Sequence, residues 1–206
     1  MSKAPSKPRP PRTLSTSALV VYAFALALGL GVSSAYFAVS GEYPLGGVAV
    51  GPWKTWPKTG SRDADPYART IVVRSGDVPL ATGEGLGLTA SLDSDGRPLD
   101  SACTYQLGSA TPQARLWTLT LYDQGGGLIA SDLQRSGFTS SEILRDADGR
   151  FTVSLSRDLQ PGNWLKLPSA GPFSLALRLY DTPASTGTAS LDVRALPRIE
   201  RVACGA

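Results

Sequence analysis

The chain contains no histidine among its 206 residues. Catalysis by serine-histidine-aspartate or cysteine-histidine groups is therefore excluded, as are zinc sites and metalloprotease motifs built on histidine. A collagen-like repeat, with glycine at every third position, is also missing. Glycine and proline are abundant instead, with 22 and 16 residues, which favours a turn-rich β architecture over a bundle of long helices.

The formal net charge of +3 does not make this a basic protein, because the excess lies in the first twelve residues. Residues 1–12 hold Lys3, Lys7, Arg9 and Arg12 and no acid, which leaves 16 basic and 17 acidic residues in the rest of the chain. A nucleic-acid-binding surface needs clustered basic side chains. Here they are spread among acids, so we expect no nucleic-acid partner.

An uncharged segment follows the basic arm, from residue 13 to residue 41. Its apolar core, Ala18 to Val39, would span about 33 Å as a helix, which matches a hydrocarbon layer of about 30 Å. The positive-inside rule puts the basic arm in the cytoplasm. We therefore expect a single-pass anchor in the inner (cytoplasmic) membrane, with the C-terminal domain in the periplasm. A cleaved signal peptide is the alternative, and it exports the domain equally.

The predicted organisation is a basic cytoplasmic arm (1–12), a transmembrane anchor or signal peptide (13–41), a linker rich in glycine, proline and tryptophan (42–64) and an exported β domain (65–206). In the linker, Trp53 and Trp56 either sit at the outer membrane interface or belong to a loop packed on the domain. Asp65 is a good N-cap and Pro66 suits the first helical position, which predicts a short helix over 66–75.

Beyond residue 85, apolar residues alternate with polar ones in five runs, a pattern typical of strands with one face in a core and one in solvent. The runs are Leu86, Leu88, Ala90 and Leu92; Trp117, Leu119 and Leu121; Phe151, Val153 and Leu155; Phe173, Leu175, Leu177 and Leu179; and Ala189, Leu191 and Val193. The turn signals between them are Asp95-Gly96, Gly125-Gly126-Gly127, Asp148-Gly149 and Pro161-Gly162. The sequence predicts an all-β fold: an antiparallel sandwich or jelly-roll-like domain behind one N-terminal transmembrane helix, with one short helix before the sheet.

Two acidic segments look like the start of a calcium-binding loop, around Asp93 and Asp95 and around Asp146 and Asp148. Neither has the glutamate at the twelfth position or the flanking helices of such a loop. We interpret both as turns and expect no metal and no cofactor. Glu142 is the best single candidate for acid catalysis without histidine, but no partner carboxylate can be identified for it.

Cys103 and Cys204 are the only cysteines, and both lie in the part expected outside the cytoplasm. An even number of thiols in an oxidising compartment favours a disulfide between them. The alternative is two separate thiols, buried or free. A bond would tie the early part of the sheet to the C-terminus.

Several strings together resemble a bacterial family known as domain of unknown function 1214. They are GPWKTWPKTGSRDADPYAR at 51–69, SDGRPLD at 94–100, RLWTLTLYD at 115–123, GFTSSEILRDADG at 137–149, PGNWL at 161–165 and FSLALRLYDTP at 173–183. The resemblance covers nearly all of 50–204 and implies a jelly-roll-like β domain. Family members carry it alone behind one membrane pass, or after a second uncharacterised domain, which we do not expect in a chain of 206 residues. The resemblance implies no activity.

These observations favour a non-enzymatic envelope module that binds a protein or a polysaccharide. A histidine-independent hydrolase or carbohydrate-processing domain is the alternative. On the strand at 173–181 the side chains opposite the apolar face include Arg178 and Tyr180, and on the strand at 115–123 they are Thr118, Thr120 and Tyr122. If the strands are neighbours, these five side chains form one surface suited to recognition, with Trp164 at its rim.

Overall fold

The computed structural model of the chain describes residues 15–39, 47–75, 78–109, 112–129, 135–169, 171–186 and 193–205. The chain divides into two compact units, Met1–Tyr43 and Pro44–Ala206. The first contains the helix α1, Thr16–Val39. Among the described residues α1 is the one helix long and apolar enough to cross a membrane, and its apolar side chains are exposed all round.

The second unit contains a six-stranded antiparallel sheet in the order β1-β2-β3-β9-β5-β6. Its strands are β1 (Val48–Val50), β2 (Trp53–Thr55), β3 (Gly85–Ala90), β9 (Phe173–Tyr180), β5 (Leu116–Asp123) and β6 (Gly137–Thr139). The helix α2, Pro66–Ser75, lies in the chain between β2 and β3. Asp65 caps it by accepting hydrogen bonds from the backbone N–H groups of Tyr67 and Ala68, at 2.8 and 3.3 Å, as predicted for an N-cap.

A four-stranded sheet has the order β10-β4-β7-β8. Its strands are β10 (Arg198–Cys204), β4 (Cys103–Ser109), β7 (Phe151–Ser156) and β8 (Asn163–Lys166). All pairs are antiparallel except β7 and β8, which run parallel. The turn predicted at Pro161-Gly162 therefore lies in the connection between the parallel strands β7 and β8, not in a hairpin. Two short 3₁₀ helices, η1 (Pro183–Thr186) and η2 (Val193–Ala195), follow β9.

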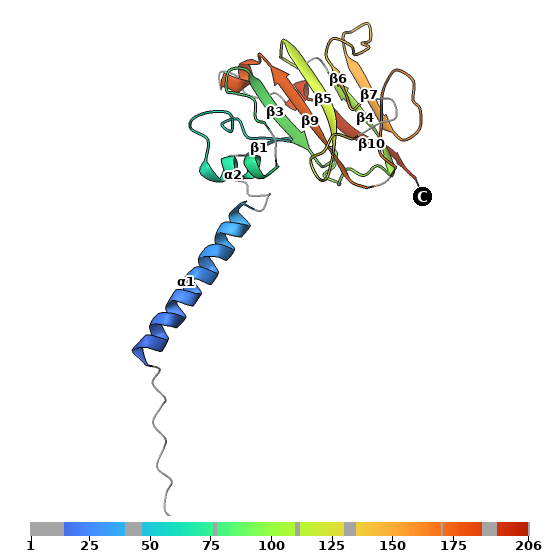
Figure 1. Ribbon diagram of the computed structural model, residues 1–206. Helices are drawn as coiled ribbons and strands as arrows, with labels where there is room; N and C mark the ends of the chain where they lie inside the picture. Colours follow the sequence, from blue (N-terminus) through green and yellow to red (C-terminus); the bar gives the residue numbers. More distant parts are fainter. Residues whose placement is uncertain are drawn as a thin grey trace, which may run out of the picture. The chain divides into compact units, whose positions relative to one another are not determined.

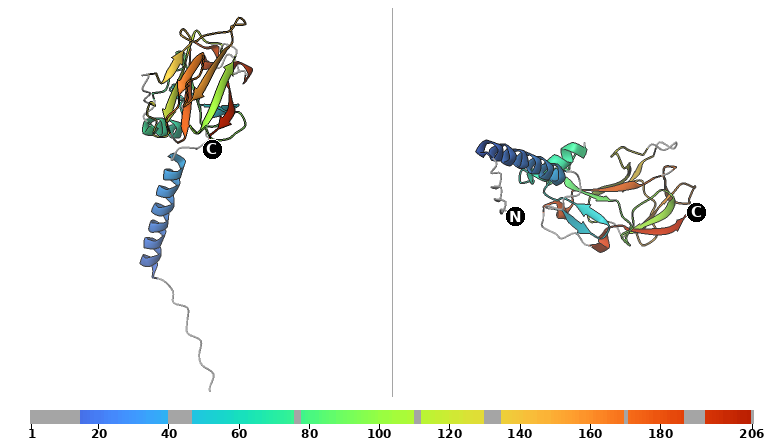
Figure 2. Two further views of the ribbon diagram at one scale, coloured as in Figure 1. Left: turned by 90° about the vertical axis from the view of Figure 1, so that its right-hand side faces the viewer. Right: turned by 90° about the horizontal axis from the view of Figure 1, so that it is seen from below.

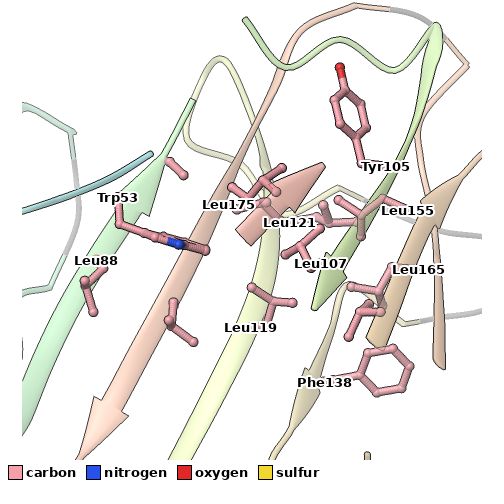
Figure 3. Packing of buried hydrophobic residues seen from close by; sticks show 14 of the residues in the cluster. Trp53, Leu88, Tyr105, Leu107, Leu119, Leu121, Phe138, Leu155, Leu165 and Leu175 are labelled. Atoms are coloured by element: carbon pink, nitrogen blue, oxygen red, sulfur yellow. The ribbon is translucent and has the colours of Figure 1, made fainter. Parts of the chain in front are cut away.

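The two sheets pack face to face as a β-sandwich around one apolar core (Figures 1 and 2). Inward side chains of the six-stranded sheet, such as Leu88, Leu119 and Leu175, meet those of the four-stranded sheet, such as Leu107 and Leu155 (Figure 3). Each of these residues is at most 1% exposed. The all-β sandwich behind one apolar helix is thus confirmed, and four of the five alternating runs form the strands β3, β5, β7 and β9.

Part of the region expected to be a linker, residues 42–64, belongs to the sandwich instead. Residues 48–55 form the hairpin β1–β2, which extends the six-stranded sheet next to β3. Trp53 is completely buried, and its indole N–H donates a hydrogen bond of 2.7 Å to the carbonyl of Pro197. The interpretation of Trp53 as part of a segment packed on the domain is therefore the correct one of the two.

The fifth alternating run falls mainly outside the described residues. Of Ala189, Leu191 and Val193, only Val193 is described, and it begins η2 instead of lying in a strand. The last strand comes later in the chain, as β10, and pairs with β4 at the edge of the four-stranded sheet.

Candidate functional site

Strands β5 and β9 are neighbours, so the adjacency on which the predicted surface depends is correct. Their antiparallel register pairs Thr118 with Arg178, Thr120 with Ala176 and Tyr122 with Ser174. Leucine and tryptophan side chains at the alternate positions fill the core. The paired residues therefore share the outer face of the six-stranded sheet, because side chains alternate between the two faces of a strand.

Arg178 and Tyr122 form the centre of this face. The Arg178 Nη1 group donates a hydrogen bond of 3.0 Å to the Tyr122 hydroxyl, and the guanidinium carbon lies 5.8 Å from the ring centroid. The contact spans the intervening pair of Thr120 and Ala176. Ala176 points outward but is only 7% exposed, which fits its position beneath this contact. The guanidinium is therefore held in place on a half-exposed surface.

Small side chains on the neighbouring strands surround this pair. The register puts Gly87 of β3 opposite Arg178 and Thr89 opposite Ala176. On the other side, Thr139 of β6 lies opposite Thr118. Lys54 of β2 lies opposite Thr89 and is exposed. We refer to the outward surface of β3, β9, β5 and β6 as the outer face.

The two remaining predicted residues lie in different places. Tyr180 is on the outer face, opposite Gly85 of β3 and Leu116 of β5, at the end of β9. Trp164 is on β8, in the other sheet, where its indole N–H donates a hydrogen bond of 3.1 Å to the carbonyl of Ser156. Trp164 therefore does not border the outer face, and its expected place at the rim is wrong.

The acidic segments that resemble calcium loops are turns closed by their own aspartates. Asp93 Oδ1 accepts hydrogen bonds from the backbone N–H groups of residues 95 and 97, at 3.0 and 2.8 Å. Asp146 Oδ1 does the same for residues 148 and 150, at 3.1 and 2.7 Å. Gly96 and Gly149 have positive φ angles of 82° and 75°, which favour glycine at this turn position. Within the described residues no cluster of three or more potential metal-ligating side chains occurs.

Asp93 differs from Asp146 in being buried, with its side chain 1% exposed. Its Oδ2 accepts a hydrogen bond of 3.0 Å from Arg97 Nε and lies 3.1 Å from Arg201 Nε. Arg201 also donates to the Pro98 carbonyl at 2.5 Å, and its guanidinium carbon is 5.4 Å from the centroid of the Tyr105 ring. Burial raises the pKa of Asp93, but the hydrogen bonds from the backbones of Arg97 and Asp95 and from the Arg97 side chain lower it more, so that the net pKa is below the ordinary value.

Glu142 also closes a turn. Its Oε1 accepts hydrogen bonds from the backbone N–H and the hydroxyl of Thr139, both at 2.9 Å. Its Oε2 lies 3.4 Å from Arg135 Nη1. The two hydrogen bonds from Thr139, and then the charge of Arg135, hold the pKa of Glu142 below its ordinary value. Such a carboxylate is ionised at neutral pH and is poorly suited to act as a general acid.

The disulfide is present between Cys103 and Cys204, which lie 101 residues apart in the sequence. The two residues face each other in the register of β4 and β10. The bond therefore closes the end of the last strand onto its neighbour, as predicted from the cysteine count.

Solved structures of two bacterial proteins resemble this chain. The VPA0106 protein from Vibrio parahaemolyticus superposes with a TM-score of 0.58 and 20% identity, covering 94% of this chain and 48% of that one. An uncharacterised protein from Burkholderia cenocepacia gives a TM-score of 0.41 and 16% identity, covering 58% of this chain and 29% of that one. The chain spans about half the length of the Vibrio protein, and the likeness to it shows a common fold alone.

No protein with a curated function matches the chain significantly. A family of proteins of unknown function matches residues 84–184, from just before β3 through β9. This span lies within residues 50–204, where the shared motifs were recognised. The β-sandwich therefore carries, over residues 84–184, the domain described as protein of unknown function DUF1214.

Proposed function

We propose that this chain is a membrane-anchored module outside the cytoplasm that binds a partner protein of the cell envelope through the outer face. It acts without catalysis, as a binding or accessory domain. The observation that carries the proposal is the Arg178–Tyr122 pair, ordered at the centre of a half-exposed sheet face. Arginine and tyrosine are enriched among residues that dominate the affinity of protein interfaces.

The location is supported by three features of the chain. Four basic residues and no acid lie in the first twelve residues, before the apolar helix, whereas the nearest basic residue after the helix is Lys54, as expected for a domain on the far side of the membrane. Helix α1 has 24 residues and no polar face. The Cys103–Cys204 bond is typical of an oxidising compartment. A cleaved signal peptide would give the same side of the membrane but no anchor.

The alternative, a histidine-independent hydrolase or carbohydrate-processing domain, has less support. It needs a pair of carboxyl groups in different protonation states. Glu142, the best candidate, has a lowered pKa because Thr139 donates two hydrogen bonds to it. A polysaccharide as the partner remains an outcome that the experiment below distinguishes.

Site-specific photo-crosslinking in the full-length chain tests the proposal. A photoreactive residue replaces Thr89, which is exposed on the outer face, or Val202, which is 57% exposed on β10 of the other sheet. We expect a discrete protein crosslink from position 89 alone. Arg178→Ala should weaken it about tenfold or more, the effect of losing a central interface residue. The control Arg198→Ala, on β10, should leave it unchanged.

The thermal midpoint of Arg178→Ala must stay close to that of the unchanged chain for the result to report on binding. A discrete crosslink from both positions, or one that survives Arg178→Ala, contradicts the proposed face. Crosslinks to heterogeneous carbohydrate instead of protein would replace the protein partner by a polysaccharide. Unfolding of Arg178→Ala would assign Arg178 a structural role and remove it from the site.

A further inference from the structure

The two residues of the Cys103–Cys204 bond differ in their access to solvent. Cys103 is 6% exposed and belongs to the apolar core of the sandwich. Cys204 is exposed and ends β10, an edge strand of the four-stranded sheet (Figure 1). In thiol–disulfide exchange a thiolate attacks one of the two sulfur atoms, and access decides which one. The burial of Cys103 leaves little room for this approach, so Cys204 is the accessible target.

The exposed end of the bond lies among positive charges. The Nη1 atom of Arg201 is 4.0 Å from the Sγ atom of Cys204. The side chain of Arg157 lies next to Gly205, the residue that follows in the chain. Arginine beside a cysteine favours its thiolate form, which is the form that attacks disulfides. Once the bond is open, Cys204 is therefore also the better nucleophile of the two cysteines.

The carboxylates near the bond have partners of their own. The Oδ2 atom of Asp93 lies 3.1 Å from the Nε atom of Arg201, and the Nη2 atom of Arg201 donates a hydrogen bond to the carbonyl of Pro98. These two contacts hold the guanidinium with Nη1 toward the sulfur. Asp100, in the turn before β4, accepts a hydrogen bond of 2.8 Å from the backbone N–H of Ala102.

The end of β10 is attached to the sandwich separately from its beginning. Ile199 is completely buried, and its backbone N–H and carbonyl both form hydrogen bonds of 2.9 Å with Ser94. A register shift between Arg201 and Ala203 divides this fixed part from the part that holds Cys204. The last residues of β10 can therefore open at Cys204 while the core stays closed.

We propose that Cys204 is a thiol-exchange site, through which external thiols and disulfides open and close the Cys103–Cys204 bond in the folded domain. Cys103 is the buried partner that resolves the mixed disulfide. The proposal goes beyond the binding function proposed above and does not depend on the outer face. The chemical class of the reagent is a thiol together with its disulfide.

The reaction has two steps, each an exchange of one sulfur–sulfur bond for another. An external thiolate forms a bond to the Sγ atom of Cys204, the bond to Cys103 breaks, and Cys103 leaves as a thiolate that takes a proton from water. A second external thiolate then attacks the external sulfur of the mixed disulfide. This releases Cys204 as a thiolate and oxidises the two external thiols to a disulfide. Closing follows the same path in reverse, with Cys204 as the attacking thiolate.

The first experiment uses the full-length chain in detergent, with the disulfide intact and reduced glutathione as the external thiol. Acid stops the reaction, the chain is unfolded, and free thiols are blocked with N-ethylmaleimide before peptide mass spectrometry. We expect glutathione on Cys204 and maleimide on Cys103, in excess over the opposite pattern on the order of tenfold or more. The matched control is the same chain in urea, where Cys103 is no longer buried and the ratio should fall toward one.

Variants with a single thiol test the closing direction. Cys103→Ala leaves Cys204, and Cys204→Ala leaves Cys103. With oxidised glutathione, the Cys204 thiol should react on the order of tenfold faster than the Cys103 thiol. Both variants must be folded at the assay temperature, which their thermal midpoints show. The glutathione experiment on the unchanged chain tests the proposal without them.

Charge variants in the Cys103→Ala background test the role of Arg201. Arg201→Gln should slow the reaction with oxidised glutathione about three- to tenfold at neutral pH and move its pH profile to higher pH, and Arg201→Lys, which keeps the charge, should restore much of the rate. Arg198→Gln removes a charge from a side chain 71% exposed on the same strand and should have no effect. Arg157→Gln replaces Arg201→Gln in this test if the latter does not fold.

The outcomes decide each part of the proposal. Glutathione found mainly on Cys103, or equally on both cysteines in the folded chain, would overturn the choice of Cys204. An adduct that forms only in urea would overturn exchange in the folded domain. Equal rates for Arg201→Gln and Arg198→Gln would overturn the role of Arg201.

A parallel arm identifies the source of the thiol. A thioredoxin-like oxidoreductase with a single active cysteine replaces glutathione at the same thiol concentration. Faster formation of the mixed disulfide than with glutathione assigns a protein thiol, and slower formation assigns a small molecule.

Discussion

Replacing Asp93 by alanine should destabilise the domain far more than the same change at Asp146. Both aspartates close a turn by accepting two backbone hydrogen bonds. Asp146 is exposed, and losing such a cap costs about 0.5–2 kcal/mol. Asp93 is 1% exposed and also contacts the side chains of Arg97 and Arg201 at 3.0 and 3.1 Å.

The expected cost of Asp93→Ala is about 3–5 kcal/mol, the usual result of removing one partner of a buried ion pair. Much of it arises because Arg201, only 18% exposed, is left without its carboxylate. Urea unfolding of the two variants measures the difference, with the disulfide kept intact in both. Equal losses for Asp93→Ala and Asp146→Ala would refute the reasoning, since the buried pair would then add nothing to the turn.

The contribution of Asp93 should also depend on pH in a definite direction. Its pKa in the folded state is lowered by the hydrogen bonds from Arg97 and Asp95, despite the opposing effect of burial. The folded state therefore binds fewer protons than the unfolded one, whose pKa is about 4. The stabilisation is complete above this value and is lost as the pH falls through the folded-state pKa. The difference in unfolding free energy between the native chain and Asp93→Ala should shrink accordingly below about pH 4.

Three further predictions concern the sandwich. Replacing both Cys103 and Cys204 by serine should lower the free energy of unfolding by up to about 4.7 kcal/mol, the chain-entropy value for a loop of this size; a loss below 1 kcal/mol in urea unfolding would contradict it. Trp53→Phe should lower the free energy of unfolding by about 2–3 kcal/mol, because the buried carbonyl of Pro197 loses its 2.7 Å hydrogen bond. An unchanged thermal midpoint would show that the hairpin β1–β2 contributes little to stability. Gly85→Ala should lower the free energy of unfolding by about 1–3 kcal/mol, because the added methyl group meets the Leu179 carbonyl. Gly87→Ala should be neutral or slightly stabilising, because its added methyl group has no atom within 4 Å. Equal effects of the two variants in thermal unfolding would contradict this contrast.

The strands that could be predicted are those whose inward positions are all apolar. In β5 and β9 the alternation of leucine with polar residues continues through the strand, and burial follows it. In β2 the alternation is hidden, because the inward Thr55 is polar. It is completely buried and satisfied by a hydrogen bond of 2.7 Å from its hydroxyl to the Gly87 carbonyl.

Strand β10 was hidden for a different reason. One of its inward positions holds the charged Arg201. Its burial is compensated by Asp93, which lies beside it although it comes over a hundred residues earlier in the chain. A register shift between Arg201 and Ala203 also interrupts the period of two. Neither the long-range ion pair nor the bulge can be recognised from the sequence of the strand itself.

The candidate surface could be predicted in composition but not in extent. Which side chains of β5 and β9 point outward follows from the alternation alone. That β5 lies next to β9, and β8 in the other sheet, depends on strand order, which no local pattern encodes. Both positions could only be assumed from the sequence: the structure confirms the assumed pairing that brings Thr118, Tyr122 and Arg178 together, whereas the assumed place of Trp164 at the rim is wrong.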